Sequence, residues 1–228
     1  MKPRIKIDSS ILVFLIVFTA FLFQFTNLYV QNKVVDNLFD CLGLVIILFG
    51  VLIRMAARGH KKAFSQKSEE LVTSGLYQHT RNPMYLGSFS LGAGFILIVW
   101  PWWSLFLFAG MFYLRFNKQM VKEEKFLFEK FGQQYNDYCK EVPRIFPKIG
   151  KLQQLNLREV FPYAQAISTK EKRGLIGWPV LAVFLETLQE QIVFGYTHVG
   201  KTFLMFMLVE VILGVVLRIF YKEQKQYE

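Results

Sequence analysis

The chain has 228 residues, of which 53% are hydrophobic and 24 are phenylalanine, and this is more apolar surface than a soluble domain of its size can bury. The formal net charge of +10 favours contact with anionic membrane lipid over nucleic acid, because the basic residues are spread along loops that border apolar runs. Several runs approach the length of about 20 residues that crosses a bilayer as a helix. We therefore predict an all-α, polytopic transmembrane bundle of five or six spans.

Apolar runs occur along most of the chain. We predict spans at residues 11–30, 38–57, 84–99, 102–116, 175–195 and 202–220. The first run follows a basic segment, residues 1–10, but lacks a small-x-small cleavage pattern, so we expect an uncleaved span rather than a signal peptide. The third and fourth runs are joined by the WPWW motif at residues 100–103, which is typical of a tight turn at the bilayer interface.

The fifth run leaves two interpretations open, because Glu186 and Glu190 share one helical face within it. These carboxylates face the interior of a bundle if the run crosses the membrane, and otherwise the run lies in the interface. With six crossings, every Lys and Arg except Lys33 and Lys201 lies on one side, as the positive-inside rule expects. We therefore predict an integral membrane protein with both termini and its active site cytoplasmic.

The sequence Arg81-Asn82-Pro83 directly precedes the third apolar run. Asn82 is a favourable N-cap and Pro83 suits the first helical position, so we expect the helix to begin here. The free N–H groups of the first turn, together with the Arg81 guanidinium, then form an anion site at the membrane edge. A capped helix whose arginine binds lipid phosphate is the alternative.

Two more polar clusters follow the hairpin of the third and fourth runs. Glu123 and Glu124 lie on the helix expected to continue the fourth run, and an antiparallel hairpin would bring them to the same side as Arg81. Helices are expected at residues 117–131 and 133–141, and the second is followed by Arg144. A solvated acidic face and contact between Arg144 and a lipid headgroup are the alternatives for these residues. Two cysteines and three scattered histidines indicate no metal site.

The motifs "LVTSGLYQHTRNPMYLG" (71–87) and "EEKFLFEKFGQQYNDYCKEVPRIFP" (123–147) resemble the isoprenylcysteine carboxyl methyltransferase and phospholipid methyltransferase family of integral membrane enzymes. The likeness covers about residues 69–147. We therefore divide the chain into a methyltransferase-like core, residues 1–148, and a C-terminal extension, residues 149–228, with one or two further membrane helices. Asn82 stands where the family usually has histidine, which puts the role of that position in question.

The resemblance implies S-adenosylmethionine as methyl donor, bound in a pocket closed by cytoplasmic helices. Arg81 and the helix start would bind the carboxylate of the donor. Tyrosine rings would face its sulfonium or adenine, and the backbone of residues 71–75 would contact the adenine. The expected catalytic residues are Arg81, Glu123, Glu124 and Arg144. The expected donor-binding residues are Leu71, Val72, Gly75, Tyr77, His79, Arg81, Asn82, Tyr85, Glu124, Tyr135 and Tyr138.

The acceptor is open, with a prenylated cysteine, a phospholipid amine, a quinone-like lipid and a small thiol all compatible with in-line methyl transfer. Two other classes share part of the pattern. Membrane sterol reductases that use NADPH have a motif similar to "YCKEVP" (138–143), although they typically place tyrosine between the proline and the arginine. A non-catalytic membrane scaffold is the third interpretation, and the oligomeric state is not indicated.

Overall fold

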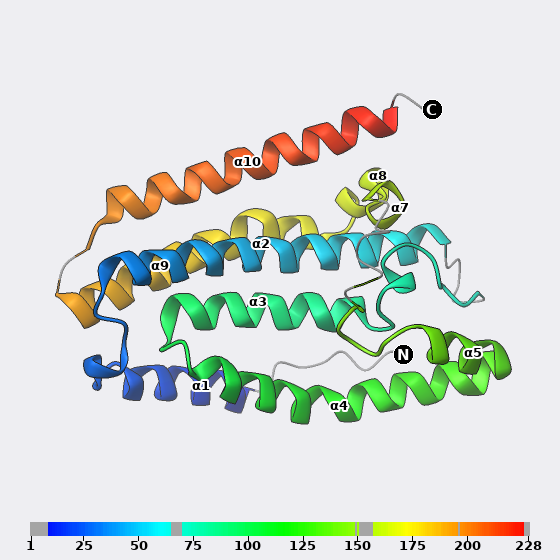
Figure 1. The fold of residues 1–228 in the computed structure, drawn as a ribbon, viewed down its shortest axis with the longest axis horizontal. Helices are drawn as coiled ribbons and strands as arrows, with labels where there is room; N and C mark the ends of the chain where they lie inside the picture. The colour runs from blue at the N-terminus through cyan, green and yellow to red at the C-terminus, as the bar shows by residue number, and fades with distance from the viewer. Residues whose placement is uncertain (1–8, 65–69, 149, 151–156, 196, 226–228) are drawn as a thin grey trace.

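The computed structural model describes residues 9–64, 70–148, 150, 157–195 and 197–225, and every regular element within them is helical (Figure 1). The all-α prediction is therefore confirmed for this part of the chain. The long helices are α1 (Ser9–Leu22), α2 (Lys33–Phe64), α3 (Pro83–Val99), α4 (Ser104–Phe131), α9 (Gly174–Phe194) and α10 (Val199–Lys225). The short ones are η1 (Thr26–Leu28), η3 (Gly75–Gln78), α5 (Gln133–Glu141), α7 (Leu157–Val160), α8 (Tyr163–Ile167) and η4 (Lys170–Arg173).

The predicted spans correspond to these helices, with different ends. α1 stops before the predicted residue 30 because the chain turns through η1, whereas α2 extends beyond 38–57 at both ends. Among the described residues, α2 is the one helix that is long and apolar enough to cross a membrane, and Val13–Leu22 and Pro83–Val99 are apolar but shorter. A bundle of five or six spans is therefore not confirmed. Residues 1–8 of the predicted basic N-terminal segment, and residue 149, where the predicted C-terminal extension begins, lie outside the described residues.

α2 and α3 approach each other through paired glycines. A Cβ atom added to Gly50 would lie 2.7 Å from the carbonyl oxygen of Gly87. A Cβ atom on Gly94 would lie 2.5 Å from the carbonyl oxygen of Gly43. Any larger side chain would separate the two backbones, so these glycines permit the close packing that small residues give to membrane helices. This seam fixes where α3 begins relative to α2.

The core lies along the middle of α2, where Ile47 and Met55 are fully buried. The C-terminal helices cover a part of α2 that α3 and α4 leave free (Figure 1). Ala182 of α9 and Ala166 of α8 are fully buried in this contact. The backbone of Ala166 leaves no room for a side chain on Gly59, since a Cβ atom there would lie 2.6 Å from the Ala166 nitrogen.

The hairpin of α3 and α4 turns at the predicted WPWW motif. The Ser104 backbone and side chain both donate to the carbonyl oxygen of Pro101, at 2.9 and 2.6 Å, which closes the turn. Trp102 and Trp103 are exposed, as interfacial tryptophans would be. Because the helices are antiparallel, the beginning of α3 and the end of α4 lie at the same end of the molecule (Figure 1). The predicted antiparallel hairpin, with its turn at residues 100–103, is therefore confirmed.

Gly132 ends α4 and reverses the chain direction into α5. Its φ of +53° is in the region that favours glycine, and its N–H donates to the Phe128 carbonyl at 2.8 Å. The predicted helix ends at residues 131 and 141 are both correct. The Pro143-Arg144 segment that follows α5 consequently returns to the beginning of α3.

The carboxylates of α9 face the interior, which was one of the two interpretations. Glu186 and Glu190 are 4% and 5% exposed. The Thr202 hydroxyl donates to Glu186 at 2.9 Å, and the His198 backbone N–H donates to Glu190 at 3.0 Å. These bonds join the end of α9 to the beginning of α10, at the end of the molecule opposite α5 (Figure 1).

Candidate active site

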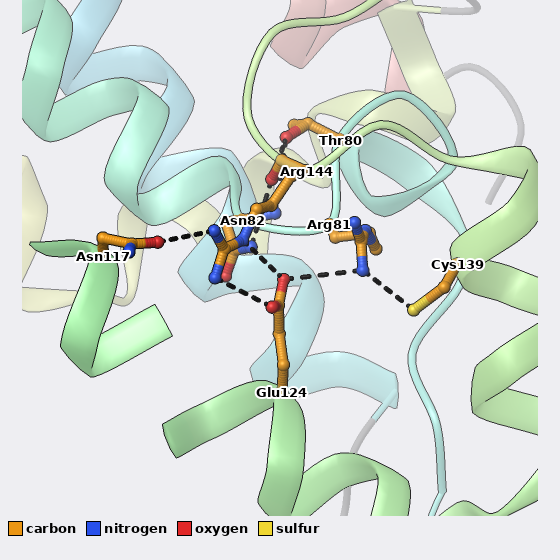
Figure 2. A network of polar contacts seen from close by, with 7 residues as sticks. All are labelled: Thr80, Arg81, Asn82, Asn117, Glu124, Cys139 and Arg144. Carbon is orange, nitrogen blue, oxygen red and sulfur yellow. Dashed lines mark hydrogen bonds and ion pairs between the residues drawn. The ribbon is translucent and has the colours of Figure 1, made fainter. Parts of the chain in front are cut away.

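The segment after α5 is hydrogen-bonded to the residues that precede α3. The Arg81 N–H donates to the carbonyl oxygen of Pro143 at 2.9 Å. The carbonyl oxygen of Arg144 accepts from the Asn82 side-chain amide at 3.1 Å and from the Thr80 hydroxyl at 3.4 Å (Figure 2). Two motifs about 60 residues apart in the sequence are thereby held together at one end of the α3–α4 hairpin.

Asn82 does not act as the side-chain cap that the sequence analysis expects. Its backbone does occupy the N-cap position, and Pro83 is the first helical residue as predicted. Its side-chain amide, however, makes no bond to the first turn of α3. The reason is chemical: the amide NH₂ is a donor, and the Arg144 carbonyl is the acceptor that it reaches.

Glu124 lies between two guanidinium groups, one from each motif (Figure 2). Its two carboxylate oxygens accept from Arg144 Nε at 3.0 Å and Nη2 at 2.9 Å, a bidentate pair. Arg81 Nη1 lies 3.5 Å from the same carboxylate. Arg144 is further fixed by Asn117, whose side-chain oxygen accepts at 2.6 Å. One carboxylate therefore balances only one of two cations, and the cluster retains a positive charge.

Arg81 is the guanidinium that is less fully engaged. Its Nη1 donates to the sulfur of Cys139 at 2.9 Å, while its Nε is buried without a hydrogen-bond partner. Burial disfavours the charged form of Arg81, but Cys139, Glu124 and Tyr135 nearby more than offset this and raise the pKa of the guanidinium. A buried cationic donor without an acceptor has unused capacity to bind an anion. Cys139 was not among the predicted site residues.

Glu123 has partners different from those of Glu124. Its carboxylate accepts from the Tyr85 hydroxyl at 3.1 Å and from Gln119 at 3.0 Å. The Tyr85 ring is buried and meets Phe116 edge-on at 5.5 Å between ring centroids. The two neighbouring acids of α4 thus have separate partners: Glu124 pairs with the arginines, and Glu123 contacts Tyr85 in the first turn of α3.

The predicted tyrosines of the site connect α5 with η3. The Tyr138 hydroxyl donates to the backbone carbonyl of Tyr77 at 2.7 Å. Burial raises the pKa of Tyr138 and raises that of Tyr77 to about 12, so both hydroxyls remain protonated at neutral pH. Tyr135 is buried, with its ring 6.1 Å from that of Tyr138. These contacts hold η3, and the chain that continues from it to Arg81, against α5.

The remaining predicted residues lie upstream in η3 and the segment before it. Gly75 is buried with a φ of +62°, and a side chain there would meet the ring of His60 at 2.7 Å. Leu71 and Val72 are half-buried, and His79 is buried at the end of η3. A role for these residues in binding a methyl donor stays a prediction.

Residues 38–134 match a family model described as phospholipid methyltransferase. The chain is also 29% identical over 133 residues to a protein-S-isoprenylcysteine O-methyltransferase from Schizosaccharomyces pombe, covering 58% of this chain and 56% of that protein. The relative of that name in Saccharomyces cerevisiae is 28% identical over 131 residues, with 54% of each chain covered. The resemblance to the isoprenylcysteine and phospholipid methyltransferase family is confirmed. No solved structure gives a significant match.

The extent of the similarity is limited in two ways. The chain spans about half the length of the curated relatives that it matches, and the family segment ends at residue 134, before Tyr135 and Arg144. A steroid 5-alpha-reductase DET2 from Solanum lycopersicum is also similar, with 28% identity over 144 residues that cover 57% of this chain and 54% of that protein. Arg81, Glu123 and Glu124 lie within the segment that matches the methyltransferase family model, whereas Tyr135 and Arg144 lie beyond it.

Proposed function

We propose that the protein is an integral membrane methyltransferase that uses S-adenosylmethionine to methylate a lipophilic acceptor. The observation that carries the proposal is the Arg81 guanidinium, which lies 3.5 Å from Glu124 and retains a buried, unpartnered Nε. Both residues lie in the family segment, Arg81 directly before α3 and Glu124 near the end of α4, and the antiparallel hairpin brings them to the same end of the molecule.

The residues of the site fit the chemical groups of such a donor. Arg81, with the first N–H groups of α3, would hold its carboxylate, and Glu124 lies close enough to take part in binding its amino group or ribose. When bound, the donor supplies an electrophilic methyl group. The task of this chain is then to align acceptor and methyl group, and alignment alone contributes much of the rate in such displacements. The Tyr138–Tyr77 bond and the bonds to the Arg144 carbonyl make the surroundings of Arg81 rigid.

A lipophilic acceptor is supported by the apolar wall next to Tyr85. Phe89 meets Phe108, Phe112 and Phe146 at centroid distances of 5.3 to 5.6 Å. Phe146 is 60% exposed, so this aromatic cluster begins at the surface. The relatives are named for isoprenylcysteine, an acceptor with an apolar chain and a carboxylate. We propose an acceptor of this class, entering from the bilayer.

Membrane placement is part of the proposal. We propose that α2 crosses the bilayer with α3, the first half of α4, α9 and α10, and that the N-terminal helix adds a sixth crossing. The positive-inside bias then makes the Arg81–Glu124 end and both termini cytoplasmic. Residues 1–148 would form the methyltransferase core and residues 149–228 the extension.

A reductase that uses NADPH is the second candidate, because of the similarity to a steroid 5-alpha-reductase. The charges of the site argue against it. NADPH carries several phosphates and needs several unpaired cations, whereas the bidentate pair with Glu124 neutralises Arg144. One incompletely paired guanidinium suits a single carboxylate better.

Binding measurements distinguish the candidates. Calorimetry on the purified protein should detect S-adenosylmethionine or S-adenosylhomocysteine but not NADP⁺. Arg81→Ala should abolish this binding, because it removes the carboxylate partner. The matched control is Lys125→Ala, one residue from Glu124 but 76% exposed. Binding of NADP⁺ alone would support the reductase, and binding of neither ligand would support a scaffold.

A further inference from the structure

A groove of about 400 Å³ lies where η4 continues into α9, outside the segment that matches the family model. We call it the α9 groove, and the residues that matter for its chemistry are Lys170, Glu171, Arg173, Gly177, Trp178 and Leu181. Its volume is within the range of sites that bind small molecules. None of these residues takes part in the contacts around Glu124 described above.

One end of the α9 groove is strongly basic. Glu171, the acid in its lining, is already paired: Arg54 Nε lies 2.9 Å and Arg58 Nη1 3.0 Å from its carboxylate. Lys170 and Arg173 are exposed at the groove. Arg54 and Arg58 thus already pair with the one carboxylate of the lining, and the excess positive charge of Lys170 and Arg173 is complementary to an anion.

The other end of the α9 groove is apolar. Trp178 and Leu181 are 40% and 38% exposed, and Phe95 meets the Trp178 ring edge-on at 5.9 Å and so fixes its position. A Cβ atom on Gly177 would have no neighbour within 4 Å, so the floor between the two ends is open. The groove therefore joins a cationic end to an apolar end along the first turns of one helix.

We propose that the α9 groove binds an anionic phospholipid, with its phosphate at Lys170 and Arg173 and an acyl chain along Trp178 and Leu181. A free phosphate would use only the basic end, and a neutral lipid only the apolar end. The proposal requires α9 to lie in the membrane, but it does not depend on methyl transfer. Anionic lipid is enriched in the cytoplasmic leaflet, which is where the orientation proposed above puts this end of α9.

Bound lipid would also strengthen the packing of the bundle. Glu171 connects η4 to Arg54 of α2, and the other end of the Arg54 guanidinium donates to Ser88 of α3 at 2.5 Å. An anion at Lys170 and Arg173 relieves the excess positive charge beside this bridge. We therefore expect lipid to raise the melting temperature as well as to bind.

The test is a titration of the full chain in neutral detergent with phosphatidylglycerol or phosphatidylcholine, read by native mass spectrometry and by thermal unfolding. The double variant Lys170→Glu/Arg173→Glu should bind phosphatidylglycerol at least about 30-fold more weakly, at about 1 kcal/mol per basic residue. The matched control is Lys118→Glu/Lys125→Glu, which makes the same charge change at two exposed positions of α4. This control should bind like the wild type.

A second variant leaves the charge unchanged. Gly177→Leu fills the groove at a position where an added Cβ atom has no neighbour within 4 Å, so the variant should fold and yet lose the thermal shift with phosphatidylglycerol. Retained binding in Gly177→Leu, or an equal shift with inorganic phosphate or phosphatidylcholine, would overturn the proposal. Donor binding is measured in parallel, so a wild-type protein that binds the methyl donor but shows no preference for phosphatidylglycerol would contradict this proposal alone.

Discussion

Glu124 is the residue on which the charge balance of the candidate site depends. It accepts two hydrogen bonds from Arg144 and lies within 3.5 Å of Arg81, whereas its neighbour Glu123 contacts Tyr85. Removing the charge of Glu124 leaves two guanidinium groups close together without a counterion. Replacing Glu123 by glutamine removes its charge but keeps a side-chain oxygen, to which the Tyr85 hydroxyl can still donate.

The two acids should therefore differ in mutagenesis. Glu124→Gln should lower the free energy of unfolding by about 1–3 kcal/mol, the cost of a partly buried charged hydrogen bond, and should weaken donor binding. Glu123→Gln should change stability much less. Thermal unfolding in detergent and calorimetry measure both effects, and equal losses in the two variants would show that the acids act as one unit.

Asn82 allows a test of the position where the family usually has histidine. Asn82→Ala removes the bond to the Arg144 carbonyl and should cost about 1 kcal/mol of stability, with looser binding of a donor. Asn82→His provides an N–H donor again and should recover most of that loss. The melting temperatures of the three proteins decide the question, and an Asn82→His variant less stable than Asn82→Ala would contradict this role.

For single residues, the sequence analysis placed Arg81, Glu124 and Arg144 in one candidate site, where the structure does bring them together, but it did not predict that Glu124 pairs with both arginines. Cys139 was missed because no spacing signal distinguishes a cysteine that contacts a guanidinium from one on a helix surface. Its position four residues after Tyr135, on the same face of α5, was the available indication. The side-chain capping role predicted for Asn82 was wrong because the preference for asparagine at N-caps is local: no first-turn N–H donates to the Asn82 side chain, and its amide instead donates to the distant Arg144 carbonyl.

Among the elements, the seam between α2 and α3 fixes the position of the candidate site. Gly43 faces Gly94 and Gly50 faces Gly87 at distances that exclude any side chain. Gly94→Val should therefore destabilise the protein by about 1–3 kcal/mol through overpacking. Gly110 of α4, where a Cβ atom meets nothing within 4 Å, is the matched control. Gly110→Ala should be neutral or slightly stabilising in thermal unfolding, and a neutral Gly94→Val would mean that the helices are not in this register.

Helix positions in the first two thirds of the chain followed from apolar runs, the WPWW turn and Gly132, because these signals are local. The ends of α1 and α2 could not be predicted in this way. The structure ends α1 at Leu22 and forms η1 within an apolar run that has no helix-breaking residue before Asn27. The packing of α8 and α9 on α2 was also not predictable. It depends on contacts such as Gly59 with Ala166, which are more than 100 residues apart in sequence.

For the whole molecule, the proposed orientation makes a prediction about accessibility. Lys140 is 65% exposed on α5, and Lys201 is exposed at the beginning of α10, toward the opposite end of the molecule (Figure 1). In sealed cells, a membrane-impermeant thiol reagent should label Lys201→Cys, introduced into a Cys41→Ser/Cys139→Ser background, but not Lys140→Cys until the cells are opened. Labelling of both positions in sealed cells would contradict the orientation.

Methyl transfer itself is the most direct test of the central claim. Purified protein in lipid should transfer a labelled methyl group from S-adenosylmethionine to an isoprenylated cysteine, with Lys125→Ala as active as the wild type and Arg81→Ala inactive. Activity in Arg81→Ala equal to that of the wild type, or no transfer to any lipophilic acceptor by a protein that binds NADP⁺, would contradict the account.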